Sequence, residues 1–160
     1  MMTGTQNVNN ILYHTMTLFF LLLFAIYDYR HHKIRNHPLC AFLVWCLFSI
    51  PLRIVSNPDL SWHHCLLQSL WGVAGGFIIL FGTALMTHGS IGGGDIKLVS
   101  LLGVLYGLNT LIYILFISCI CILLHYGLIK LAKKKTLSAI PFAPYLFIGC
   151  ACCVLPQLYF

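Results

Sequence analysis

The sequence predicts an all-α, polytopic membrane protein in which six transmembrane helices form a single domain, residues 1–160. Sixty per cent of the residues are hydrophobic and 8% are charged, whereas soluble domains carry about 25% charged residues. Residues 60–94, 98–129 and 136–160 contain no Asp, Glu, Lys or Arg. The first two of these runs are 35 and 32 residues long, so each exceeds the roughly 20 apolar residues of one span.

The first three spans are expected at residues 11–28, 38–55 and 65–87, where apolar segments are bounded by polar or charged residues. The ten residues at the beginning, MMTGTQNVNN, contain no Lys or Arg. They therefore lack the basic region of a cleavable signal peptide. The first span is expected to remain part of the mature protein.

The last three spans are expected at residues 93–107, 110–129 and 139–158. A single helix over residues 98–129 would be about 48 Å long, which exceeds the hydrocarbon core of about 30 Å. The segment YGLNT, residues 106–110, contains Gly107 and Asn109, two residue types that are common in turns. We therefore expect a break in this segment.

The distribution of basic residues supports this break and sets the orientation. With it, eight of the nine basic residues lie on one side of the membrane and Arg53 lies on the other. The positive-inside rule places the basic side in the cytoplasm, and both termini outside. Without the break, the lysine run would lie opposite the first basic loop. The eight residues are Arg30, Lys33, Arg35, Lys97, Lys130, Lys133, Lys134 and Lys135.

These basic loops are expected to contact anionic membrane lipid, and no nucleic-acid partner is expected. The eight cysteines are interpreted as small apolar residues in lipid or helix contacts. The histidine pairs 31–32 and 63–64 lack the carboxylate and cysteine partners of a typical metal site. No metal site is therefore expected.

The sequence contains three acidic residues, Asp28, Asp59 and Asp95. Asp59 lies in the stretch SNPDLSW and is interpreted as a solvated turn residue. Asp28 ends the first span and Asp95 begins the fourth, so both are predicted at the cytoplasmic edge of the membrane. An ionisable side chain at membrane depth is costly and indicates function. The alternative for either acid alone is an interfacial residue balanced by Arg30 or Lys97.

Two carboxylates close together in a partly dry site do not ionise independently and can share one proton. One can then activate water as a base while the other polarises a carbonyl group as an acid. This is aspartic-protease chemistry, and it needs neither a metal nor a cofactor. The preceding glycines, Gly92, Gly93 and Gly94, allow close approach of an extended peptide. The alternative for the glycines is a flexible loop or tight helix packing.

Three motifs in this order resemble those of the type IV prepilin leader peptidases, which are membrane aspartic proteases with a GxGD motif. GGGDIKL contains the motif at Gly92, Gly94 and Asp95. Asp28 is followed by YRHHK and then by Ile34-Arg35-Asn36, where the family has Ile-Pro-Asn. Pro141-Phe142-Ala143-Pro144 matches a Pro-Phe-x-Pro motif that precedes the last span in the family.

The resemblance implies a GxGD aspartic protease architecture, with Asp28 and Asp95 as the catalytic pair and no cofactor. Its substrate would be a prepilin or a type II secretion pseudopilin, cut after a glycine that ends a short basic leader. The enzyme would lie in the bacterial inner membrane with its active site at the cytoplasmic side. Substrate binding or site shaping would involve Gly92, Gly93, Gly94, Lys97, Asn36, Pro141, Phe142 and Pro144.

The resemblance is to a short form without the N-terminal domain associated with methyltransferase activity, whose cysteine pairs have no counterpart before Cys40. Arg35 stands where the family motif has proline. A further alternative is therefore a family member that has lost its activity and acts as an assembly factor. A small proton-coupled carrier, or an accessory subunit of one, is the alternative from another class. The inverted repeats expected of a carrier are not evident. The sequence leaves open which aspartate is the acid, and the oligomeric state.

Overall fold

The computed structural model describes residues 4–31, 36–56, 61–87, 91–133 and 141–159, and within these ranges every regular element is a helix. The helices are α1 (Gly4–His31), α2 (Asn36–Ser56), α3 (Trp62–Met86), α4 (Gly93–Lys133) and α5 (Ala143–Tyr159). The all-α prediction is confirmed. The expected position of Asp59 and the Ile34-Arg35 part of the first motif lie outside the described residues.

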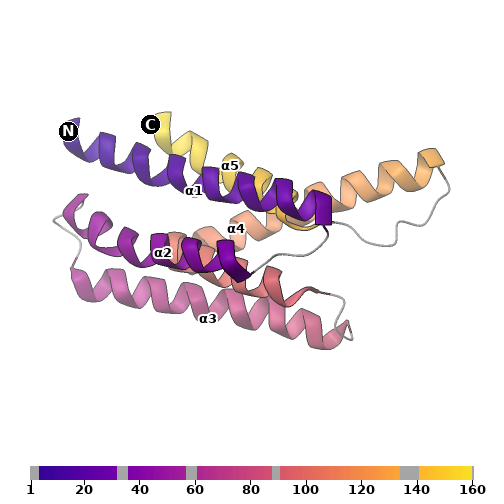
Figure 1. The fold of residues 1–160 in the computed structure, drawn as a ribbon, viewed down its shortest axis with the longest axis horizontal. Helices are drawn as coiled ribbons and strands as arrows, with labels where there is room; N and C mark the ends of the chain where they lie inside the picture. The colour runs from indigo at the N-terminus through magenta and orange to yellow at the C-terminus, as the bar shows by residue number, and fades with distance from the viewer. Residues whose placement is uncertain (1–3, 32–35, 57–60, 88–90, 134–140, 160) are drawn as a thin grey trace.

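Four of the helices are long and apolar enough to cross a membrane: Asn9–His31, Asn36–Ile54, Trp62–Met86 and Gly93–Leu131. A fifth apolar helix, Ala143–Pro156, is shorter. The protein is therefore a multi-pass membrane protein. The start of α1 and the end of α5 lie at the same end of the bundle (Figure 1).

The separate helices expected at residues 93–107 and 110–129 form one element, α4, and no loop divides them. The chain instead leaves the helical conformation at one residue, Gly107, with φ 72° and ψ 174°. This backbone region is essentially restricted to glycine. Because a single glycine reverses the chain, the predicted break is present but the predicted loop is not.

The two parts of α4, which we call the first limb (residues 93–106) and the second limb (residues 108–133), run back along each other (Figure 1). The carbonyl oxygen of Val99 and the side chain of Leu111 both lie beside Gly76 of α3, 3.1 and 3.0 Å from the place that a Cβ would occupy. Since these two residues flank Gly107, both limbs contact the same part of α3.

Side chains from three other helices bind the backbone carbonyls next to this reversal. The Tyr13 hydroxyl donates to the Leu105 carbonyl at 2.6 Å. The Val104 carbonyl accepts from Ser69 at 3.0 Å and from Arg53 at 3.4 Å. The last carbonyls of a helix lack partners within the helix, and lipid offers no donor. These side chains therefore stabilise the end of the first limb.

Tyr13→Phe is expected to lower the free energy of unfolding by about 1 kcal/mol, because it removes one buried hydrogen bond and little else. Thermal unfolding of the purified protein in detergent micelles measures this loss. Tyr29→Phe is the matched control, because the Tyr29 side chain is 71% exposed. Equal melting temperatures for the two variants would contradict a stabilising role for the Tyr13 hydroxyl.

The contact between α3 and the first limb of α4 depends on two glycines. A Cβ added to Gly72 would collide with the carbonyl oxygen of Gly103, and a Cβ added to Gly103 would collide with that of Gly72. Small residues of this kind let membrane helices approach closely. The first limb is thereby held against α3, and this contact fixes the position of the residues at its beginning, including Asp95.

Candidate active site

The two candidate catalytic acids lie at the same end of the bundle. Asp28 is in the last turn of α1, and Asp95 is in the first turn of α4. The Asp28 side chain is buried, with 5% of its surface exposed. The Asp28 carboxylate is close enough to repel a negative charge on Asp95. Two acids that are far apart in the sequence are thus brought into electrostatic contact.

Asp28 also contacts the beginning of α5. The backbone N–H of Ala143 donates to Asp28 Oδ2 at 3.0 Å. The preceding residue, Phe142, begins the helix with its carbonyl oxygen, which accepts from the N–H groups of Tyr145 and Leu146. The Pro141–Pro144 motif therefore supplies a backbone donor to Asp28. The sequence assigned Pro141, Phe142 and Pro144 to the site, but it did not reveal the role of the residue between them.

Asp95 is positioned by the glycine that precedes α4. The Gly92 carbonyl accepts from the N–H groups of Asp95 and Ile96, at 3.0 and 3.3 Å. The Asp95 carboxylate lies beside Gly92, since a Cβ there would be 3.1 Å from Oδ2. A Cβ on Gly93 would meet no atom within 4 Å. Of these two glycines, only Gly92 is in close contact with the acid.

The other oxygen of Asp95, Oδ1, is buried. Within the described parts of the chain it has no hydrogen-bond partner. A buried polar atom without a partner is costly, and such atoms often mark the place where chemistry occurs. The site therefore has an acceptor oxygen that is available to a substrate group or to a water molecule.

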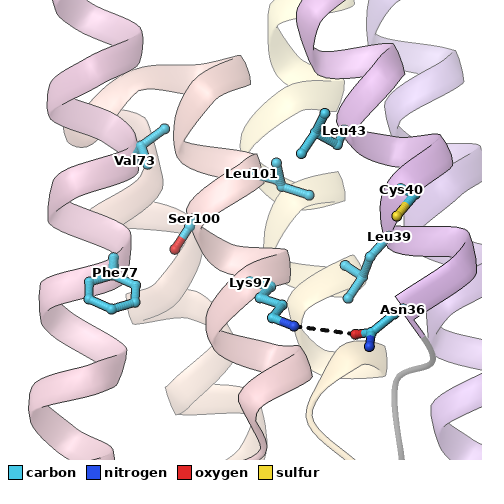
Figure 2. A pocket seen from close by; sticks show the side chains of 9 residues that line it. All are labelled: Asn36, Leu39, Cys40, Leu43, Val73, Phe77, Lys97, Ser100 and Leu101. Atoms are coloured by element: carbon cyan, nitrogen blue, oxygen red, sulfur yellow. Dashed lines mark hydrogen bonds between the residues drawn. The ribbon is translucent and has the colours of Figure 1, made fainter.

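Lys97 and Asn36, two further predicted site residues, meet beside an apolar groove (Figure 2). Lys97 Nζ donates to Asn36 Oδ1 at 3.3 Å and so joins α4 to α2. The groove has a volume of about 530 Å³ and lies between α2, α3 and the first limb of α4. It is lined by Asn36, Leu39, Cys40, Leu43, Val73, Phe77, Lys97, Ser100 and Leu101.

A second, more polar cavity of about 200 Å³ lies near the opposite end, beside Gly107. Its lining includes Tyr13, His14, Arg53 and Tyr106. His14 stacks on Tyr106, while Tyr13 and Arg53 bind carbonyls of the first limb. These polar residues are explained by the end of the first limb and do not contact the aspartates.

The described residues include no group of three or more His, Cys, Asp or Glu side chains that could hold a metal ion. The His63 ring contacts the Trp62 ring at a tilt, and the His31 ring contacts the Tyr27 ring in the same way. Asp28 and Asp95 are the two carboxylates of the site. This arrangement suits proton transfer to and from water or a carbonyl group.

The sequence profile of the type IV leader peptidase family matches residues 15–127, a range that contains both aspartates. The prepilin leader peptidase/N-methyltransferase of Bacillus subtilis (strain 168) is 36% identical over 133 residues, which cover 81% of this chain and 49% of the relative. The chain thus spans about half the length of that relative. No solved structure matches the chain. The chain belongs to the type IV leader peptidase family.

Proposed function

We propose that this protein is an aspartic endopeptidase that removes the short basic leader of a prepilin or a type II secretion pseudopilin. The observation that carries this proposal is the position of Asp28 and Asp95 at one end of the bundle, near enough for the charge of one to act on the other. Both acids lie in the part of the chain that matches the peptidase family. The B. subtilis relative is itself a prepilin leader peptidase.

In the proposed reaction, one aspartate removes a proton from water while the water oxygen bonds to the scissile carbonyl carbon. The other aspartate donates its proton to the carbonyl oxygen, which gives a tetrahedral diol. The first aspartate then returns its proton to the leaving nitrogen as the C–N bond breaks. A proton from the diol passes back to the second aspartate, which restores the site. No metal or cofactor is needed for these steps.

The proposed topology has six spans, with the two limbs of α4 crossing the membrane separately. Two features support it: the reversal at Gly107 and the position of the basic residues. Lys97 lies near the start of the first limb and Lys130 near the end of the second, whereas Arg53 binds beside the reversal. The positive-inside rule then places the aspartates at the cytoplasmic face of the bacterial inner membrane. A basic leader would meet them there.

The glycines, Asn36 and Lys97 are proposed to shape the site for an extended peptide. Gly92 leaves room beside the Asp95 carboxylate, where a side chain would crowd Oδ2. Lys97 lies two residues after Asp95 and closes one end of the apolar groove together with Asn36. Side chains of the substrate next to the scissile bond would contact this end of the groove.

Cleavage of a co-expressed prepilin, followed as a mobility shift on a gel, tests the proposed function. We expect the wild-type protein to convert the prepilin to the shorter, mature form. A prepilin with the glycine before the cleavage point replaced by a bulky residue serves as the uncleavable control. If no shift is seen with several prepilins and pseudopilins, the proposal fails, and proton flux into loaded vesicles would then test the carrier.

Lys97→Gln is expected to raise the KM for the prepilin about tenfold and to change kcat less than about threefold. Lys97 lies at the end of the groove, and the loss of one charged hydrogen bond to a substrate costs about 1.5 kcal/mol. Steady-state cleavage of the purified prepilin measures both constants. Lys130→Gln, which alters an exposed lysine of the second limb, is the matched control. Equal KM values for the two variants would remove Lys97 from substrate binding.

A further inference from the structure

The two aspartates have different surroundings, and we infer from this difference that they have different roles. Asp28 is the ionised carboxylate that removes the proton from water. Asp95 is the protonated acid that donates to the scissile carbonyl oxygen. The reaction in which these roles occur rests on the proposed function. Which aspartate is the base and which is the acid is inferred from the contacts of the two side chains.

Asp28 has the surroundings of an anion. Its Oδ2 accepts a hydrogen bond from the Ala143 N–H, the first backbone donor of α5. Ala143 and Asp28 are both buried, so little water competes for this contact. A carboxylate that accepts a hydrogen bond from a backbone N–H is stabilised by that bond. The buried Asp28 carboxylate therefore has a donor that its ionised form can use.

Asp95 has the surroundings of a neutral acid. One oxygen of its carboxylate, Oδ2, lies beside Gly92, whose backbone favours the charged form, so the difference from Asp28 lies in the other oxygen. The second oxygen, Oδ1, is buried and has no partner among the described residues. An ionised carboxylate with a buried, unpaired oxygen is strongly disfavoured. A proton on Oδ1 removes this cost, because it turns the unpaired acceptor into a donor that is available to the substrate.

The surrounding charges do not reverse this difference. Two carboxylates this close together do not both carry a full negative charge, so one of them holds a proton. Within the described part of the chain, the other titratable side chains at this end either lie exposed or contact side chains other than the two aspartates. They are Tyr27, Tyr29, Arg30, His31 and His37 of α1 and α2, Lys97, His125, Tyr126 and Lys130 of α4, and Tyr145 of α5.

The assignment gives each proton a definite path. The proton of the attacking water passes to Asp28 while its oxygen bonds to the carbonyl carbon. The proton of Asp95 Oδ1 passes to the carbonyl oxygen at the same step. When the C–N bond breaks, Asp28 gives its proton to the leaving nitrogen, and a diol hydroxyl returns a proton to Asp95. Both residues are then in their starting states.

Ala143→Pro tests the assignment because proline lacks the N–H that binds Asp28. Proline is well tolerated at the first position of a helix, and the preceding Phe142 is not helical, as a residue before proline should be. We expect the acid side of the pH profile for prepilin cleavage to move up by about 1 pH unit, since a hydrogen bond to a charged group is lost. Ala143→Gly retains the N–H and should keep the wild-type midpoint.

If Ala143→Pro folds and keeps the wild-type midpoint, the assignment is overturned. A second measurement needs no substrate: the thermal unfolding of Asp28→Asn and Asp95→Asn at neutral pH. Asparagine removes the charge of Asp28 and should lower its melting temperature by about 3 °C or more. It replaces an already neutral group at Asp95, so the melting temperature should stay the same or rise. A greater loss of stability for Asp95→Asn than for Asp28→Asn would overturn the assignment.

The two measurements also separate this inference from the proposed function. If no prepilin is cleaved by the wild-type protein but Asp28→Asn is the less stable variant, the protonation states stand and the proposed substrate is wrong. If prepilin is cleaved but Asp95→Asn is less stable than Asp28→Asn, the proposed peptidase activity stands and the roles of the two aspartates must be exchanged.

Discussion

Asparagine in place of either Asp28 or Asp95 is expected to reduce prepilin cleavage by about 10³-fold or more. Each aspartate transfers a proton in both halves of the proposed reaction, and a positioned acid or base contributes about 10²–10⁴-fold. Asparagine keeps the shape of the side chain but cannot exchange a proton. The rate of the purified variants on a prepilin in mixed micelles, compared with wild type, measures the loss.

The control for this experiment is Asp59→Asn, which removes the third acid of the chain and should leave the rate within about twofold of wild type. The double variant Asp28→Asn/Asp95→Asn should be little slower than either single variant, because residues that act as a unit have non-additive effects. Cleavage at the wild-type rate by either single variant would exclude an aspartate pair as the catalyst.

Gly72→Ala is expected to lower the melting temperature by about 2–12 °C, because the added Cβ would force two backbones apart. In the native structure this Cβ would collide with the Gly103 carbonyl oxygen, and a backbone carbonyl cannot rotate away as a side chain can. Overpacking of this kind costs about 1–3 kcal/mol, which is about 2–4 °C per kcal/mol in a chain of this size. Unfolding in detergent, followed by circular dichroism, measures the change.

Gly82→Ala is the matched control, because it makes the same chemical change in the same helix. A Cβ at Gly82 would meet no atom within 4 Å. The higher helix propensity of alanine should leave this variant as stable as wild type or slightly more stable. If Gly72→Ala and Gly82→Ala unfold at the same temperature, the close approach of α3 to α4 contributes nothing to stability.

The sequence predicted the parts of the fold that depend on the physics of the bilayer. The apolar runs predicted the helices, and the excess length of the run 98–129 predicted a break that the structure has at Gly107. The rarity of acids drew attention to Asp28 and Asp95, which the structure brings together. The length of an apolar run can be compared with the thickness of the bilayer, and the cost of placing a charged side chain in the membrane depends on that residue. Both can be evaluated from the sequence without knowing how the helices pack.

Contacts that depend on the packing were not predicted. The donor to Asp28 is a backbone N–H, which every residue except proline carries, so the identity of Ala143 gives no signal. Tyr13 and Arg53 bind carbonyls that become available only because α4 reverses nearby. Of Gly92 and Gly93, only Gly92 would crowd Asp95 if it carried a side chain. To predict any of these contacts, one must know how segments that are distant in the sequence are placed relative to one another.

The bond between Asp28 and Ala143 has a consequence for the order in which the site is assembled during synthesis. The two residues are 115 positions apart, so the ribosome releases Asp28 long before it synthesises its donor. Until α5 has entered the bilayer and docked against α1, the Asp28 carboxylate cannot accept a hydrogen bond from the Ala143 N–H. Under the proposed function, the nascent chain would lack its complete aspartate site through most of its insertion and would be unable to cut neighbouring membrane proteins during that time.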